Sequence, residues 1–114
     1  DWVNRSCIDT EDKMPQNQTF QNGIDFIKRS VNEDQWFLQI EAFDPHEPFY
    51  TQQAYKDLYP HDYHGKNLDW PDYGKNTYGD EATEHVRMEY AALLSMCDHS
   101  LGQLLDVMDA NDMW

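Results

Sequence analysis

The sequence contains patterns for two amphipathic helices but for only one apolar strand, and this imbalance constrains its fold more than any other feature. Residues 19–32 and 80–109 repeat apolar side chains at helical spacing, whereas residues 36–43 alternate with the two-residue period of a strand. A lone strand cannot pair its backbone N–H and C=O groups. Because a helix–strand–helix order is typical of α/β proteins, the sequence predicts an α/β segment of a larger protein, whose other strands complete the sheet.

The boundaries of these elements follow from caps and breakers. Thr19 is placed to cap the first helix and Asp80 the second, whose first turn is acidic, as the helix dipole favours. At 1.5 Å per residue the second helix would span roughly 45 Å. Residues 1–18 are expected to form an irregular lead-in, and residues 44–79 a long aromatic loop of the kind that is often functional.

The apolar side chains of each pattern define the faces that we expect to be buried. On the first helix they are Phe20, Ile24, Ile27 and Val31. The strand carries Trp36, Leu38, Ile40 and Ala42 on one face and Phe37, Gln39, Glu41 and Phe43 on the other. The long helix has a stripe of Val86, Tyr90, Leu93, Leu94, Cys97, Leu101, Leu104, Leu105 and Met108. Since an unpaired apolar strand is an aggregation edge, the isolated chain is expected to self-associate through residues 36–43.

Composition excludes several classes of protein. The 114 residues suffice for one small domain, and a formal net charge of −14 argues against binding to nucleic acid or to an anionic membrane. No apolar run approaches the roughly 20 residues of a membrane span. The first residues do not form a signal peptide, so any targeting segment is expected to lie outside this chain.

A charged turn directly follows the apolar segment and contains the strongest candidate for chemistry, His46. Its imidazole lies between Pro45 and Pro48, which restrict the backbone on both sides. Open α/β sheets place ligand-contacting residues at the carboxyl ends of strands, and a histidine there can donate a proton or bind an anionic oxygen. The alternative is a surface turn in which Asp44 and Glu47 only cap loop amides.

Other histidines give weaker signals. His61, Asp62 and His64 could form a zinc-binding clip, but no second cluster in the sequence supports it, and a solvated loop is favoured. On the long helix His85 and His99 would lie about 21 Å apart and could not share a ligand. Both are therefore interpreted as surface or packing residues, and no metal ligand is assigned.

Four further residues have structural interpretations. Asp98 is expected to be a helix-surface or capping carboxylate, and Gly102 to allow another element to approach the helix closely. Cys7 and Cys97 are interpreted as free thiols, although a disulfide between them stays open. The sequence has no glycine-rich phosphate loop, nucleophile elbow or Cys-x-x-Cys pair.

Three stretches resemble a known family. "FLQIEAFDPHEPF" is similar to the segment of bacterial sulfatases that leads into a His-x-Pro-Phe loop. "LYPHDYHGKNLDWPDYG" resembles the Asp-Trp-Pro-x-Tyr-Gly loop of an arylsulfatase-like branch, and "VRMEYAALLSMCDHSLGQLLDVMDANDMW" resembles the long helix of that branch. The resemblance covers nearly all of residues 15–114, and the stretches come in the order that the family has.

This resemblance implies the alkaline-phosphatase fold, a mixed-sheet sandwich to which the chain would contribute a helix, a strand, a loop and a long helix. It implies a soluble bacterial enzyme that hydrolyses sulfate esters of small molecules or carbohydrates. Such enzymes use a formylglycine, made from Cys or Ser, beside a calcium or magnesium ion. By the match to the family's loop, His46 is expected to bind the sulfate or to protonate the leaving oxygen.

The sequence departs from the family in ways that matter for activity. It lacks the Cys-x-Pro-Ser-Arg-type motif that supplies the formylglycine, the Asp-Asp metal pair and the Asp-His-Gly strand end. The chain alone is therefore expected to bind no cofactor and to be inactive. Two alternatives remain: a fragment of a phosphonate or phosphodiester hydrolase of the same superfamily, and a small acidic domain that assembles by strand pairing.

Overall fold

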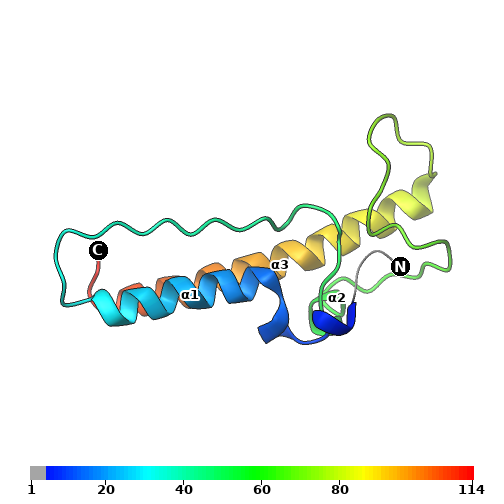
Figure 1. Cartoon of the computed structure of the whole chain (residues 1–114). Helices are drawn as coiled ribbons and strands as arrows, with labels where there is room; N and C mark the ends of the chain where they lie inside the picture. The colour runs from blue at the N-terminus through cyan, green and yellow to red at the C-terminus, as the bar shows by residue number, and fades with distance from the viewer. Residues whose placement is uncertain (1–4) are drawn as a thin grey trace. The chain divides into compact units, whose positions relative to one another are not determined.

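The structure is a computed structural model that describes residues 5–114, and its regular elements are all helical (Figure 1). The order is η1 (Arg5–Cys7), η2 (Glu11–Lys13), α1 (Pro15–Ser30), α2 (Gln53–Lys56) and α3 (Asp80–Ala110). These residues form two compact units, which are residues 5–43 with 98–114, and residues 44–97. The predicted α/β fold is wrong, because residues 5–114 form no β-strand.

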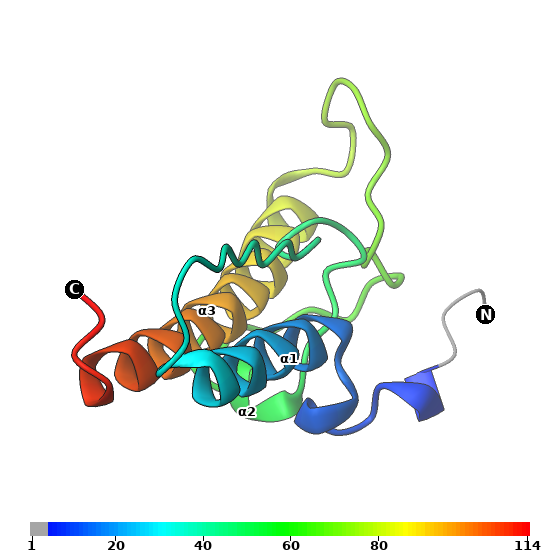
Figure 2. The same ribbon diagram turned by 60° about the vertical axis from the view of Figure 1, so that its left-hand side comes forward.

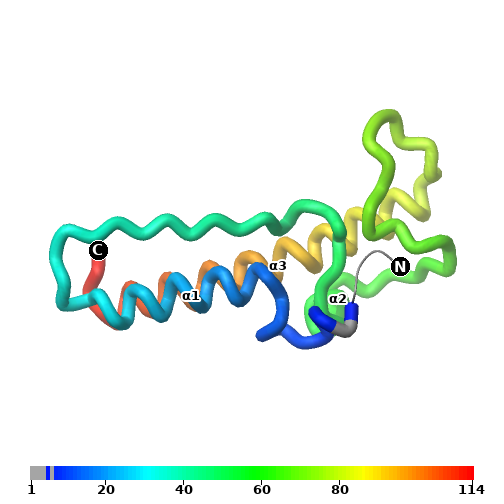
Figure 3. The backbone as a smooth tube through the Cα atoms, viewed as in Figure 1, coloured from blue at the N-terminus to red at the C-terminus, as the bar shows by residue number. Residues whose placement is uncertain are grey.

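The predicted strand, residues 36–43, is an extended segment without sheet partners. It runs back along α1 in the opposite direction (Figure 3). In the part of the chain that the structure describes, residues 36–42 make no backbone hydrogen bond, so an extended backbone alone does not produce a strand here. The predicted alternation of faces is nevertheless confirmed. The half-buried side chains are Trp36, Leu38, Ile40 and Ala42, and the exposed ones are Phe37, Gln39, Glu41 and Phe43.

The inward face of this segment packs on α1. The rings of Trp36 and Phe26 meet edge to face with centroids 5.4 Å apart. Gly23 allows the closest approach, because a Cβ atom at this position would lie 2.3 Å from Ile40 Cδ1. Figure 2 shows the segment and α1 side by side from a second direction. Side-chain packing on a helix therefore takes the place of strand pairing.

Helix α1 (Pro15–Ser30) begins four residues before the predicted start at Thr19. Pro15 is the reason, since proline is favoured in the first turn of a helix, where its missing N–H has no intrahelical partner. Ile24 and Ile27 are buried, as the sequence predicted. The lead-in predicted as irregular contains η1 and η2, and its first four residues lie outside the described part of the chain.

Helix α3 (Asp80–Ala110) confirms the predicted helix of residues 80–109 almost to the residue. Its predicted apolar stripe is only partly buried. Of its members Leu93 is fully enclosed, whereas four are exposed: Tyr90, Leu94, Leu101 and Leu105. Met96, which the stripe did not include, is also fully enclosed. None of the helices formed by residues 5–114 has both the length and the apolar character of a membrane-spanning helix.

The long loop of residues 44–79 contains the short helix α2 (Gln53–Lys56) and is fastened to the first part of α3 by side-chain hydrogen bonds. The hydroxyl of Thr51 donates to Met96 Sδ over 3.3 Å, and the hydroxyls of Tyr59 and Ser95 lie 2.8 Å apart. Leu68 is buried within the same unit. These contacts hold the loop beside α3, where His61 meets His85.

Candidate functional site

His46 lies on the turn after the extended segment, with its side chain 43% exposed. Its Nδ1 lies 3.0 Å from the backbone oxygen of Glu47 and 3.1 Å from Glu47 Oε2. A carbonyl oxygen only accepts hydrogen bonds, so Nδ1 carries a proton and donates it. The Trp70 ring meets the imidazole edge to face at 6.4 Å. The turn therefore fixes the orientation of the His46 ring.

Burial disfavours negative charge close to this turn. It raises the pKa of Asp44 above its ordinary value, although the charge of His46 acts in the opposite direction. Burial, together with the charge of Asp44, raises the pKa of the Cys97 thiol to about 11. Cys97 is thus an unreactive thiol on α3, and Cys7 is exposed. Both cysteines are free thiols, as predicted.

The calcium or magnesium ion and the formylglycine implied by the sulfatase resemblance do not fit the residues present here. Calcium takes six to eight oxygen ligands. At the His46 turn the Glu47 carboxylate already faces the imidazole, and the raised pKa of Asp44 disfavours the anion that a cation would need. Neither cysteine has the Pro and Arg context that formylglycine formation uses in that family. The His46 turn and the two cysteines therefore supply neither group.

A second group of side chains comes together between the loop and α3, and consists of His61, His85 and Glu89. Their ligand atoms all lie within 4.8 Å of one another. His61 Nε2 is 2.7 Å from His85 Nδ1, and Glu89 is buried beside them. The ammonium group of Lys56 forms an ion pair with Glu89 Oε2. We call His61, His85 and Glu89 the His–His–Glu cluster.

Hydrogen bonds determine which nitrogens in this cluster carry protons. His61 Nδ1 lies 2.8 Å from the backbone oxygen of Tyr59 and must donate to it. In the neutral ring Nε2 of His61 therefore has a lone pair, which accepts the proton of His85 Nδ1. Burial lowers the pKa of His85. The charge of Glu89 has a smaller effect in the opposite direction, and the charges of His61 and Lys56 lower the pKa further. Burial thus favours the neutral form of the His85 imidazole.

Tyr63 fixes the ring plane of His85. The two rings stack with centroids 4.1 Å apart and an angle of 15° between them. Gly65 leaves room for this arrangement, since a Cβ atom at that position would lie 2.2 Å from the Tyr63 hydroxyl oxygen. An open groove of about 670 Å³ borders the cluster and is also lined by Lys56, Tyr59 and Tyr63.

The remaining candidates from the sequence do not gather into a site. The zinc clip of His61, Asp62 and His64, which the sequence left as the less favoured interpretation, is absent. His64 pairs with Asp62 at 3.0 Å in solvent, while His61 pairs with His85. His99 instead lies 3.8 Å from Glu11. Asp98 is an exposed helix-surface residue, as predicted. The prediction for Gly102 is wrong, since a Cβ there would meet no described atom within 4 Å.

Sequence reasoning missed His85 and Glu89 as partners of His61. The available signal was their spacing, because residues four apart on a helix lie on the same face. A histidine and a carboxylate on the same helix face can bind one metal ion together. The third ligand comes from a loop 24 residues earlier, and no periodic pattern indicates which loop residue approaches the helix.

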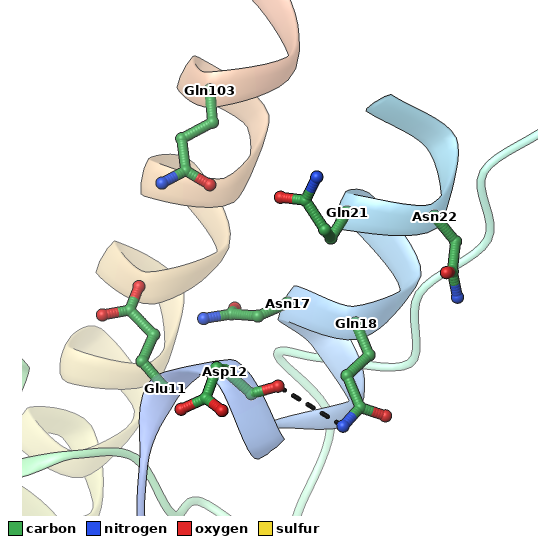
Figure 4. A pocket seen from close by; sticks show the side chains of 7 residues that line it. All are labelled: Glu11, Asp12, Asn17, Gln18, Gln21, Asn22 and Gln103. Atoms are coloured by element: carbon green, nitrogen blue, oxygen red, sulfur yellow. Dashed lines mark hydrogen bonds between the residues drawn. The ribbon is translucent and has the colours of Figure 1, made fainter. Parts of the chain in front are cut away.

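A polar pocket of about 560 Å³ lies elsewhere, lined by residues of η2, α1 and α3 (Figure 4). Its side chains are two carboxylates and five carboxamides: Glu11, Asp12, Asn17, Gln18, Gln21, Asn22 and Gln103. The Gln18 side chain donates to the backbone oxygen of Asp12 over 3.3 Å. Carboxylates repel anions, so this pocket is poorly suited to a sulfate group.

Comparisons of the chain with protein-family models, with curated proteins and with solved structures return no match.

Proposed function

We propose that this chain is part of a sulfatase, in which His46 contacts the sulfate group or the leaving oxygen of a sulfate ester. The observation that carries the proposal is the His46 turn, which combines a His-x-Pro-Phe motif with an oriented and partly exposed imidazole. The Asp-Trp-Pro-x-Tyr-Gly stretch supports it, because its Trp70 contacts the same imidazole. The substrate would be a sulfated small molecule or carbohydrate.

The chemistry proposed for His46 follows from its hydrogen bonds. With Nδ1 committed to the Glu47 carbonyl, the second proton of the imidazolium resides on Nε2. Nε2–H can donate a hydrogen bond to an anionic sulfate oxygen, or pass its proton to the alcohol oxygen as the S–O bond breaks. The Glu47 carboxylate forms an ion pair with the charged ring and keeps its orientation.

The other parts of the reaction lie outside this chain's own residues. The sequence lacks the formylglycine motif and the Asp-Asp pair of the calcium or magnesium site, so the isolated 114 residues are expected to hydrolyse no sulfate ester. We therefore propose a contribution of the His46 loop to an active site and no independent activity.

The test uses the full-length enzyme that contains this chain. His46→Ala should lower kcat/KM for a sulfate ester by about 10²-fold or more if the imidazole is a general acid. The substitution should lower kcat/KM less for esters of acidic phenols than for alkyl esters, because an acidic phenol leaves without being protonated. His64→Ala, which removes an 89% exposed imidazole from the later loop, is the matched control and should leave kcat/KM unchanged.

The same assay separates the alternative within the superfamily. Greater kcat/KM for a phosphonate monoester or a phosphodiester than for every sulfate ester would favour a phosphonate or phosphodiester hydrolase. No turnover of any sulfate ester by the full-length enzyme, or an unchanged rate in His46→Ala, would refute the proposal.

A second candidate, assembly through strand pairing, is favoured by the backbone of residues 36–42. These residues form no backbone hydrogen bonds within the described chain, and the outward Phe37 is 85% exposed. An extended edge of this kind can pair with a second copy. Light scattering on the isolated chain should then detect a dimer or larger species that Phe37→Lys dissociates. A monomer at all concentrations would exclude this candidate.

A further inference from the structure

We propose that His61, His85 and Glu89 bind a single divalent transition-metal ion of the zinc class. The site is independent of the proposed sulfate chemistry, because it shares no residue with the His46 turn. It joins a loop to α3 through three side chains whose ligand atoms already lie within 4.8 Å of one another. Two imidazoles and a carboxylate are a ligand set that zinc uses in proteins.

Two of the three ligands are placed by the helix itself. His85 and Glu89 are four residues apart on α3 and so project from the same face. Tyr63 stacks on the His85 ring and restricts its rotation. Glu89 is only 8% exposed, which limits the rotamers that its carboxylate can adopt. Because this half of the site is rigid, binding requires little ordering of side chains.

The third ligand, His61, has the hydrogen bond that metal-bound histidines make. Its Nδ1 donates to the Tyr59 carbonyl over 2.8 Å, which fixes the tautomer with a lone pair on Nε2. That lone pair faces His85 Nδ1 at 2.7 Å. A metal ion would take the place of the proton between the two nitrogens. The neutral His85 ring has a single N–H proton, so this proton would move from Nδ1 to Nε2 through solvent, and the metal-bound ring would stay neutral.

The site must open slightly to accept the ion. Two nitrogens bound tetrahedrally at about 2.0–2.1 Å from zinc lie roughly 3.4 Å apart, which is more than the present 2.7 Å. His61 is exposed and belongs to an irregular loop, so its ring can move by the required distance of about 0.7 Å. The bordering groove of about 670 Å³ leaves the fourth position open to water or to a ligand.

Lys56 opposes metal binding in the present arrangement. Its ammonium group neutralises Glu89 through Oε2 and adds positive charge beside the cation. Lys56→Gln should therefore tighten metal binding. Removal of a surface lysine that does not contact the cluster should leave metal affinity unchanged. Calcium should bind poorly, since it requires six to eight oxygen ligands and this site offers two nitrogens.

The experiment titrates the tag-free chain with Co²⁺ and follows its visible absorption, and then with Zn²⁺ by calorimetry. One equivalent of Co²⁺ should produce the intense bands of a four-coordinate site, and Zn²⁺ should displace it. His61→Ala, His85→Ala and Glu89→Gln should each weaken binding by about 10-fold or more. His99→Ala, which removes a histidine from the same helix, should leave affinity unchanged.

Circular dichroism of each variant shows whether it folds. His61→Ala is the decisive variant, because His61 is exposed, whereas a change at the buried Glu89 can also disturb folding. Equal Co²⁺ affinity of the wild type and a folded His61→Ala variant would overturn the proposal. Weak binding of several Zn²⁺ ions and of several Ca²⁺ ions would also overturn it. The 22 carboxylate residues of the chain could produce such binding without a specific site. Weaker binding in Lys56→Gln would also contradict it.

Discussion

The contact between Gly23 and Ile40 provides the sharpest test of how the extended segment packs. Gly23→Ala would place a Cβ atom 2.3 Å from Ile40 Cδ1 and 2.8 Å from Ile40 Cγ1. Carbon atoms in contact normally lie 3.5–4.0 Å apart. The overlap therefore exceeds 1 Å unless the Ile40 side chain moves, and the substitution tests whether residues 36–43 lie on α1 at this register.

Two effects of opposite sign determine the magnitude. Alanine stabilises a helix interior relative to glycine by about 1 kcal/mol. Overpacking costs typically about 1–3 kcal/mol, and here the lower part of that range is expected because Cδ1 is the flexible end of its side chain. Gly23→Ala should thus leave the free energy of unfolding unchanged or lower it by about 1 kcal/mol. In the Ile40→Ala background the same change should raise it by about 1 kcal/mol.

Urea unfolding followed by circular dichroism gives these free energies, and the fluorescence of Trp36, which contacts Phe26, reports the same interface. The double-mutant cycle should give a coupling energy of about 1–2 kcal/mol. Gly102→Ala is the matched control, since this helix glycine has no described atom within 4 Å of an added Cβ and should gain about 1 kcal/mol in both backgrounds. Additive effects of Gly23→Ala and Ile40→Ala, within about 0.5 kcal/mol, would refute the packing of the segment on α1.

Three further predictions concern Cys97 and Leu93, which both lie on α3. Burial raises the pKa of the Cys97 thiol from 9.0 to about 11, so less of it is thiolate at pH 8. Its alkylation at pH 8 should therefore be about 100-fold slower in the folded chain than in urea. Equal rates would contradict its burial. Because of this higher pKa in the folded chain, the Cys97 thiol loses its proton at lower pH in the unfolded state than in the folded state. The free energy of unfolding should therefore fall as the pH rises from 9 towards 11. Cys97→Ser should make this fall less steep. Leu93→Ala should lower the free energy of unfolding by about 2–5 kcal/mol, because Leu93 is fully enclosed. Leu94→Ala should lower it by less than about 1 kcal/mol, because Leu94 is 45% exposed. Equal losses in the two variants would contradict the assigned core.

Local patterns predicted the helices better than the sheet for a physical reason. A helix pairs its own backbone groups, so the periodicity and acidic first turn of residues 80–109 were sufficient to locate α3. A strand needs a partner, and the alternation of residues 36–43 identifies two faces without showing what pairs with the edges. The predicted start of α1 at Thr19 is too late, because proline at the first helical position, here Pro15, favours a helix.

The two proposed sites differ in what the sequence could show. His46 follows an apolar segment directly, so its turn and neighbours were visible in the order of residues, and the structure adds the orientation of its ring. The His–His–Glu cluster depends on a long loop folding back on α3, which is determined by contacts such as Tyr59 with Ser95. Because the sites share no side chain, His46→Ala should leave cobalt binding unchanged and His61→Ala should reduce it. Loss of cobalt binding in both variants would instead indicate that residues 44–97 unfold as a unit, and would remove the basis for assigning either effect to local chemistry.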